Sequence, residues 1–121
     1  MIEHRSLVKS FHYAYQGVAY AVKENQNIRI LIAIAIMVMI ASIFFQINAF
    51  EMGILGVMIL LVLSAEMINT SLEEMTDLIT TEHRKEAKIA KDVAAGMVLV
   101  VSLGSLIVGV LIFLPYILKL F

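Results

Sequence analysis

The stretch "AEMINTSLEEMTD", residues 65–77, follows a long apolar run, and its polar side chains include Glu66, Asn69, Thr70, Glu73 and Asp77. On an α-helix, at 100° per residue, these side chains fall within about 100° of one another and form one stripe. A charge near the membrane core costs at least a few kcal/mol, so acids at that depth usually face a cavity and mark function. The stretch therefore predicts a polar site at the end of a membrane span.

The composition supports a membrane protein. The chain has 121 residues, of which 61% are hydrophobic and 16% are charged, whereas a soluble domain carries about a quarter charged residues. Three segments have almost no charge, at 30–45, 52–65 and 93–118. A helix needs about 20 residues to cross the hydrocarbon core, so the middle segment has to extend into the polar stripe. We therefore expect an all-α integral membrane protein with three spans.

Several chemistries are excluded by what the sequence lacks. There is no cysteine, so disulfides, zinc thiolates and thiol catalysis are excluded. None of the six glycines belongs to a GxxxxGK[ST] or dinucleotide-binding pattern, so a nucleotide would have to bind without those cradles. No secretory-signal pattern precedes the first apolar run, so we expect the N-terminus to be retained.

The basic residues predict the orientation in the membrane. Lys and Arg gather before residue 30 and again in 84–91, whereas the first connection, "QINAFE", holds none. Because Lys and Arg in short loops mark the cytoplasmic side, we expect the N-terminus and the polar stripe in the cytoplasm and the C-terminus outside.

The expected elements form one domain over residues 1–121. An amphipathic period predicts a helix at 5–26 that lies on the membrane surface, and spans are expected at 30–48, 51–79 and 93–118. Thr80 and Thr81 are expected to cap a separate cytoplasmic helix at 82–91, which carries a basic face. Because three spans cannot enclose a large polar site, we expect a homo-oligomer with sites completed by neighbouring subunits.

The spacing within the stripe suggests two tasks. Glu66 and Glu73 are two helical turns apart, about 10 Å along the axis, which is too far for a shared proton and long for one shared metal ion. One carboxylate could act on a group dissolved in the membrane, while the other holds a cation nearer the surface. Carboxylates suit Mg²⁺, which often bridges one or two acids to nucleotide phosphates.

Other interpretations remain open at this point. Glu66 could lie solvated at the headgroup boundary, with Asn69 bonded to a neighbouring helix. The chain could be a proton-coupled transporter subunit in which Glu66 carries the proton, although such acids usually lie near the midplane. An accessory subunit that oligomerises through Asn69 and the glycines would leave Glu73, Asp77 and Lys91 unexplained.

The sequence also resembles a known family. "EMINTSLEEMTDLIT", followed by "AKIAKDVAAGMVLV" and preceded by "KSF…AYQG", is similar to the signature of the small prokaryotic diacylglycerol kinases. "DLIT" and "AKDVAAG" look closer to the Gram-positive branch that phosphorylates undecaprenol than to the branch that prefers diacylglycerol. The resemblance implies three spans, an N-terminal surface helix and a bacterial cell-membrane homotrimer with shared active sites. It also implies transfer of phosphate from Mg-ATP to a lipid alcohol.

The resemblance implies a role for each matching residue. Glu66 would be the catalytic base that binds the lipid hydroxyl, with Asn69 positioning it. Glu73 would bind Mg²⁺ and the nucleotide phosphates, with Asp77 supporting it. The remaining implied contacts are to ATP from Tyr13, Glu82, His83, Arg84, Lys91 and Asp92, and to the lipid from Ala95.

The chain departs from the family pattern at one position. The family usually has a second metal-binding acid just before the first span, and an ungapped match places Asn25 there, with Glu24 one residue earlier. Glu24 could reach the ion after a one-residue adjustment; otherwise Asn25 would supply a neutral oxygen. Either residue could therefore be the second metal ligand.

Overall fold

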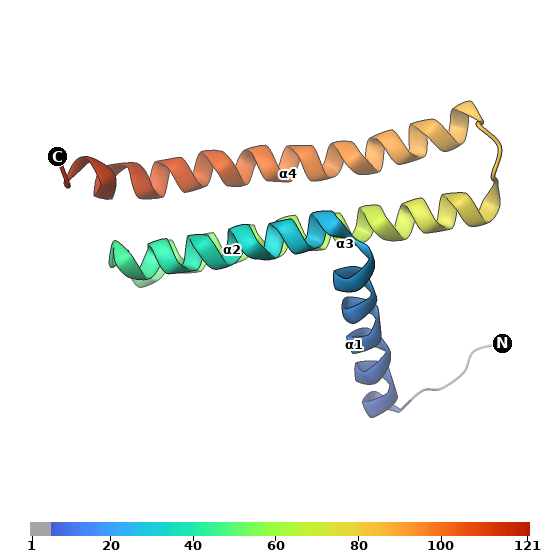
Figure 1. Cartoon of the computed structure of the whole chain (residues 1–121), viewed down its shortest axis with the longest axis horizontal. Coiled ribbons are helices and arrows are strands. Elements are labelled where there is room, and N and C mark those ends of the chain that lie inside the picture. Colours follow the sequence, from blue (N-terminus) through green and yellow to red (C-terminus); the bar gives the residue numbers. More distant parts are fainter. Residues whose placement is uncertain (1–5) are drawn as a thin grey trace.

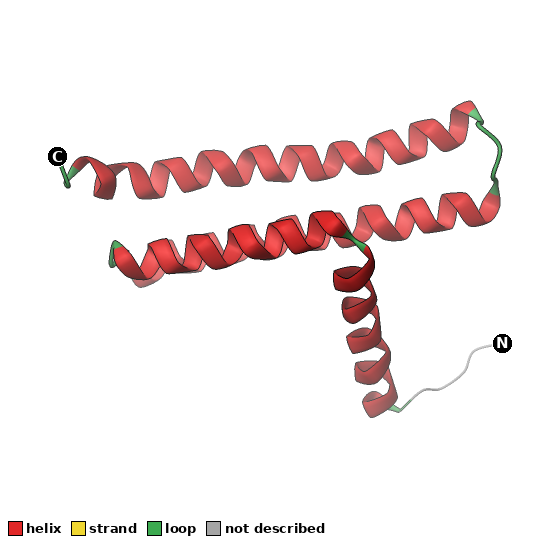
Figure 2. Cartoon of the chain, viewed as in Figure 1, coloured by secondary structure: helices red, strands yellow, loops and turns green. Residues whose placement is uncertain are grey.

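The computed structural model describes residues 6–121, and within that range the regular structure is helical (Figure 2). Four helices follow one another: α1 Leu7–Glu24, α2 Gln26–Phe44, α3 Ala49–Ile79 and α4 Lys85–Leu118. This confirms the all-α class. The first helix falls within the expected 5–26, although residue 5 lies outside the described residues.

α3 is the central helix of the chain. It packs against α4 along much of its length and against α2 on another side. In Figure 1, α4 runs antiparallel to α3, while α1 projects away from the other three helices at a steep angle. Three helices, α2, α3 and α4, are long and apolar enough to cross a membrane, as the sequence predicts.

The first connection between spans is a tight turn rather than a loop. After α2 ends at Phe44, the amide of Gln46 donates to the Ile43 carbonyl and that of Ile47 to the Ser42 carbonyl. Gln46 itself has a positive φ of 53°. These are the bonds of a Schellman motif, in which a left-handed residue satisfies the last carbonyls of a helix. Asn48 then caps α3, so two spans meet with only four residues between them.

The second connection differs from the prediction. The sequence predicts separate helices at 82–91 and 93–118, with a break between them. The structure has no break there: α4 is continuous from Lys85 to Leu118. Thr80 ends α3 instead of capping the next helix, and Arg84 precedes α4 without a side-chain cap. The physical reason is that "KEAKIAKDVAA" is rich in strong helix formers and lacks Gly and Pro, so the charges at 91–92 do not interrupt it.

Candidate active site

The polar stripe predicted on α3 changes from buried to exposed along the helix. Glu66 and Asn69 are buried, with 4% and 7% of their surface exposed, whereas Glu73 and Asp77 are exposed. The helix continues without a break to Ile79, so all four side chains keep the helical spacing. The stripe thus joins a buried carboxylate to exposed carboxylates within one continuous helix.

Glu66 is held by a residue from a different helix. Nδ2 of Asn25, at the junction of α1 and α2, donates to Glu66 Oε1 at 3.2 Å and also to the Thr70 hydroxyl. The Thr70 hydroxyl in turn donates to the Glu66 carbonyl at 3.0 Å. Within residues 6–121, Glu66 Oε2 accepts no hydrogen bond. One carboxylate oxygen is therefore fixed and the other is left for a proton donor from outside.

Asn69 presents an unsatisfied acceptor. Its Nδ2 donates to Glu73 Oε1 at 3.3 Å, whereas its Oδ1 is buried and lacks a partner among the described residues. A buried polar atom without a partner costs about 1–3 kcal/mol, and native structures rarely keep one without a reason. Oδ1 can accept a hydrogen bond or ligate a cation, and it lies one helical turn from Glu66 and from Glu73.

Ion pairs surround the connection between the exposed end of α3 and the first turns of α4. Lys91 Nζ lies 2.6 Å from Asp77 Oδ1 and so links α4 to α3. Within the connection, Arg84 pairs with Glu82 at 3.0 Å, and Lys88 pairs with Asp92 on α4 at 2.6 Å. Of these pairs, Lys91 with Asp77 places a cation directly at the exposed end of the stripe.

The other residues singled out from the sequence are exposed and more dispersed. Tyr13 lies in the middle of α1, tilted against the ring of His12. Glu24 ends α1, His83 lies in the α3–α4 connection, and Ala95 follows the buried Ala94 on α4. Among the described residues, Glu24, His83 and Ala95 make no hydrogen bond or ion pair with the four side chains of the stripe.

A further contact between α1 and α3 was not predicted from the sequence. The Tyr20 hydroxyl donates to Glu74 Oε1 at 3.5 Å and so joins α1 to α3. The negative charge of Glu74 raises the pKa of Tyr20 above its ordinary value, so the phenol stays protonated as the donor. The residues are 54 positions apart, and no local pattern signals such a pair.

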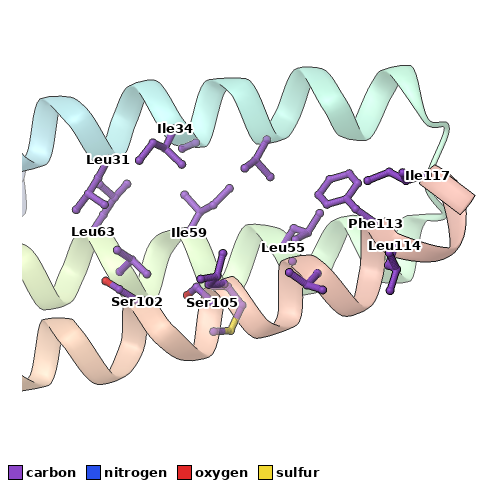
Figure 3. A pocket seen from close by; sticks show the side chains of 17 residues that line it. Leu31, Ile34, Leu55, Ile59, Leu63, Ser102, Ser105, Phe113, Leu114 and Ile117 are labelled. Atoms are coloured by element: carbon purple, nitrogen blue, oxygen red, sulfur yellow. The ribbon is translucent and has the colours of Figure 1, made fainter.

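An apolar cavity of about 590 Å³ lies between α2, α3 and α4 (Figure 3). Its lining includes Val62 and Leu63 on α3, one helical turn before Glu66. Side chains of Leu31 and Ile59 point into the same space from α2 and α3 (Figure 3). Glu66 is thus located where the polar stripe meets an apolar, membrane-depth space.

Comparison with known proteins identifies this arrangement. A family model described as prokaryotic diacylglycerol kinase matches residues 12–113, which include both the α1–α2 hinge and the whole stripe. The chain belongs to the prokaryotic diacylglycerol kinase family. The resemblance stated from the sequence motifs is therefore confirmed.

Two relatives within this kinase family carry different substrate names. The diacylglycerol kinase of Synechocystis sp. is 38% identical over 116 residues, covering 95% of this chain and 66% of the relative. The undecaprenol kinase of Bacillus subtilis is 38% identical over 107 residues, covering 88% of this chain and 87% of the relative. The chain therefore spans just under two thirds of the first relative and most of the second, and equal identity does not separate the two substrates.

The kinase family implies Mg²⁺, and the donor set of the chain fits a cation shared with a nucleotide. Within residues 6–121, no three acids or histidines cluster closely enough to hold a metal by themselves. Mg²⁺, however, usually takes only one or two carboxylates and completes its shell with substrate phosphates and water. The exposed Glu73 carboxylate offers an oxygen donor of that kind, and it accepts a 3.3 Å hydrogen bond from Asn69 Nδ2.

Proposed function

We propose that this chain transfers the γ-phosphoryl group of Mg-ATP to undecaprenol in the bacterial cell membrane. Membership of the family places it among the lipid kinases, which are phosphotransferases with an alcohol acceptor. The single observation that carries the proposal is the buried Glu66 carboxylate, located between an apolar cavity and a polar stripe. A base at that depth can meet the hydroxyl of a lipid without drawing the lipid out of the membrane.

The acceptor side of the reaction is assigned to Glu66 and Asn69. Glu66 Oε2 takes the proton of the lipid hydroxyl as the hydroxyl oxygen forms its bond to the γ-phosphorus and the bond to ADP breaks. Asn69, buried one helical turn from Glu66, positions the incoming hydroxyl for this transfer. General-base assistance of this kind contributes about 10²–10⁴-fold in rate. Ala95, small and exposed on α4, borders the lipid.

The donor side is assigned to the exposed end of the stripe. Glu73 would hold Mg²⁺ together with the phosphates of ATP, with Glu24 as the second carboxylate and Asp77 as support. Bound Mg²⁺ neutralises charge on the phosphates, and phosphoryl transfer depends mainly on such positioning and charge neutralisation. Contacts to ATP are proposed for Tyr13, Glu82, His83, Arg84, Lys91 and Asp92.

The assembly and orientation are part of the same proposal. Within residues 6–121, no three acids or histidines lie close enough to hold a metal, and Tyr13 and Glu24 are carried by α1, which projects away from the other helices (Figure 1). A homotrimer would let α1 of one subunit complete the site of another. Because the basic residues flank the polar stripe, ATP would enter from the cytoplasm, with the N-terminus on the same side and the C-terminus outside.

The substrate is tested by direct transfer. Purified protein receives γ-labelled Mg-ATP with undecaprenol or, in a separate reaction, diacylglycerol, and label is counted in the extracted lipid. We expect transfer to undecaprenol with the higher kcat/KM. A preference for diacylglycerol, the substrate named for the Synechocystis relative, would contradict undecaprenol as the acceptor but not phosphoryl transfer to a lipid alcohol. Absence of label in every lipid alcohol would contradict the proposed function.

A further inference from the structure

The Asn25 side chain uses all of its hydrogen-bonding capacity. An asparagine amide has two N–H donors and an oxygen with two lone pairs. Its Oδ1 accepts from the backbone amides of Asn27 at 2.9 Å and Ile28 at 3.3 Å, which caps the start of α2. Its Nδ2 donates to Glu66 and Thr70. Both N–H donors and both acceptor lone pairs of the Asn25 side chain therefore have a partner.

The chemistry of those partners fixes which end of the amide faces which way. Backbone amides can only donate, so they need the oxygen, and an ionised carboxylate can only accept, so it needs the nitrogen. A cation at Asn25 would have to displace the two amides that cap α2, and the N–H groups facing Glu66 would repel it. The side chain is thus poorly suited to bind metal, although it occupies the family position of a metal-binding acid.

We propose that Asn25 is a positioning residue for the Glu66 base, an inference that rests on the proposed function. One amide caps α2 and also holds Glu66 Oε1, so that Oε2 points to the acceptor. Thr70 adds a second fixed point, because its hydroxyl bonds both Asn25 and the Glu66 carbonyl. The orientation of the base is thereby set by the hinge between α1 and α2.

A second side chain, that of Arg29, also holds the junction between α1 and α2. Arg29 Nη1 donates to the carbonyls of Val22 at 3.0 Å and Lys23 at 2.6 Å, the last turn of α1. Asn25 therefore lies between a helix end satisfied by Arg29 and a helix start that it caps itself. A displacement of α1 would be transmitted to the carboxylate through a single side chain.

The test separates capping from positioning. Serine is a good N-cap but lacks the amide donor, so Asn25→Ser keeps the cap and removes the bonds to Glu66 and Thr70. Asn25→Asp also keeps the cap but faces Glu66 with a like charge. Asn48→Ser is the matched control, because Asn48 caps α3 at the opposite end, through a 2.8 Å bond from Glu51 N.

The quantities to be measured are kcat, the KM for Mg-ATP and the dependence of the rate on Mg²⁺ concentration, with the preferred lipid alcohol as substrate. Loss of a hydrogen bond to a charged group predicts a kcat about 10- to 100-fold lower for Asn25→Ser, with the KM for Mg-ATP unchanged. Asn25→Asp is expected to be lower still, and Asn48→Ser to match the wild type. If Asn25 were a metal ligand, Asn25→Asp would instead strengthen Mg²⁺ binding and Asn25→Ser would raise the Mg²⁺ requirement. That pattern, or a wild-type kcat in Asn25→Ser, would overturn the inference.

A second measurement does not depend on activity. The ¹³C resonance of the Glu66 carboxyl, identified by its loss in Glu66→Gln, is expected to move in Asn25→Ser and stay in place in Asn48→Ser. An unmoved resonance in Asn25→Ser would overturn the inference even in an active enzyme. A wild-type protein that labels no lipid would instead contradict the proposed function, while this spectrum would still decide the contact.

Discussion

Lys91 Nζ lies 2.6 Å from Asp77 Oδ1, so the exposed end of α3 is joined to the start of α4 across the connection between them. The two side chains remain 40% and 63% exposed. An ion pair this exposed adds little to stability. Its effect is to hold the Lys91 ammonium beside the acids of the stripe, where the nucleotide phosphates are proposed to bind.

This relationship predicts an effect on ATP binding with little effect on folding. Lys91→Met is expected to raise the KM for Mg-ATP about tenfold, because a charge-assisted bond to phosphate is lost. Asp77→Asn should raise the KM less, since the ammonium remains but is no longer held. Steady-state kinetics and thermal unfolding in detergent check both variants. The exchange Asp77→Lys with Lys91→Asp restores the pair on swapped helices; recovery of the wild-type KM in it would contradict a direct role for Lys91.

Substitutions of the two glutamates of the stripe, Glu66 and Glu73, are predicted to change different kinetic constants. Glu66→Gln removes the base but keeps the shape, so kcat is expected to fall about 10²–10⁴-fold while the KM for Mg-ATP stays within twofold. Glu73→Gln is expected to weaken Mg-ATP binding, and higher Mg²⁺ should recover part of the activity. Transfer assays over a range of ATP and Mg²⁺ distinguish them. Reversed phenotypes would show that the assigned roles are exchanged.

Much of the fold follows from periodicity in the sequence. The stripe from Glu66 to Asp77 predicts one helix that leaves the membrane without a break, and α3 does continue to Ile79. The break expected near residue 92 was wrong because a pair of charges marks a change of solvent, not the end of a helix. Helix propensity decides that point, and the residues around Lys91 favour continuation.

The candidate site is less accessible to sequence reasoning, because its decisive contacts are not local. Asn25 and Glu66 are 41 residues apart, and an asparagine before an apolar run signals only a helix cap. The family pattern suggested a metal-binding role at this position, since it aligns residues without showing where an amide points. Burial and donor geometry supply that information, and only a folded chain contains them.

The turn between α2 and α3 predicts a stabilising substitution. Gln46 has a φ of 53°, a conformation that costs a residue with a Cβ about 1–2 kcal/mol. Gln46→Gly should relieve this cost, and Gln46→Ala should not, because alanine keeps the Cβ. We expect the glycine variant to be about 1 kcal/mol more stable than the alanine variant in detergent unfolding. Equal stability of the two variants would show that the turn carries no left-handed strain.

Asn69 predicts a conflict between stability and activity. Its buried Oδ1 has no partner within residues 6–121, and its Nδ2 makes a 3.3 Å bond to Glu73. Replacing it by leucine removes an unsatisfied acceptor and adds apolar surface in a membrane helix, so stability is expected to rise by about 1 kcal/mol. The same change removes the polar side chain that is proposed to position the lipid hydroxyl, so kcat/KM for the lipid should fall by about tenfold or more.

The isosteric Asn69→Asp is the matched control for this prediction. It keeps the side-chain volume but loses the bond to Glu73 and places a second negative charge beside it, so it should lose both stability and activity. Detergent unfolding and lipid-transfer kinetics compare the two variants with the wild type. A leucine variant less stable than the wild type would mean that Oδ1 has a partner in the assembled enzyme. A neighbouring subunit would supply that partner. A leucine variant with full activity would remove Asn69 from the acceptor site, because an apolar side chain cannot orient a hydroxyl.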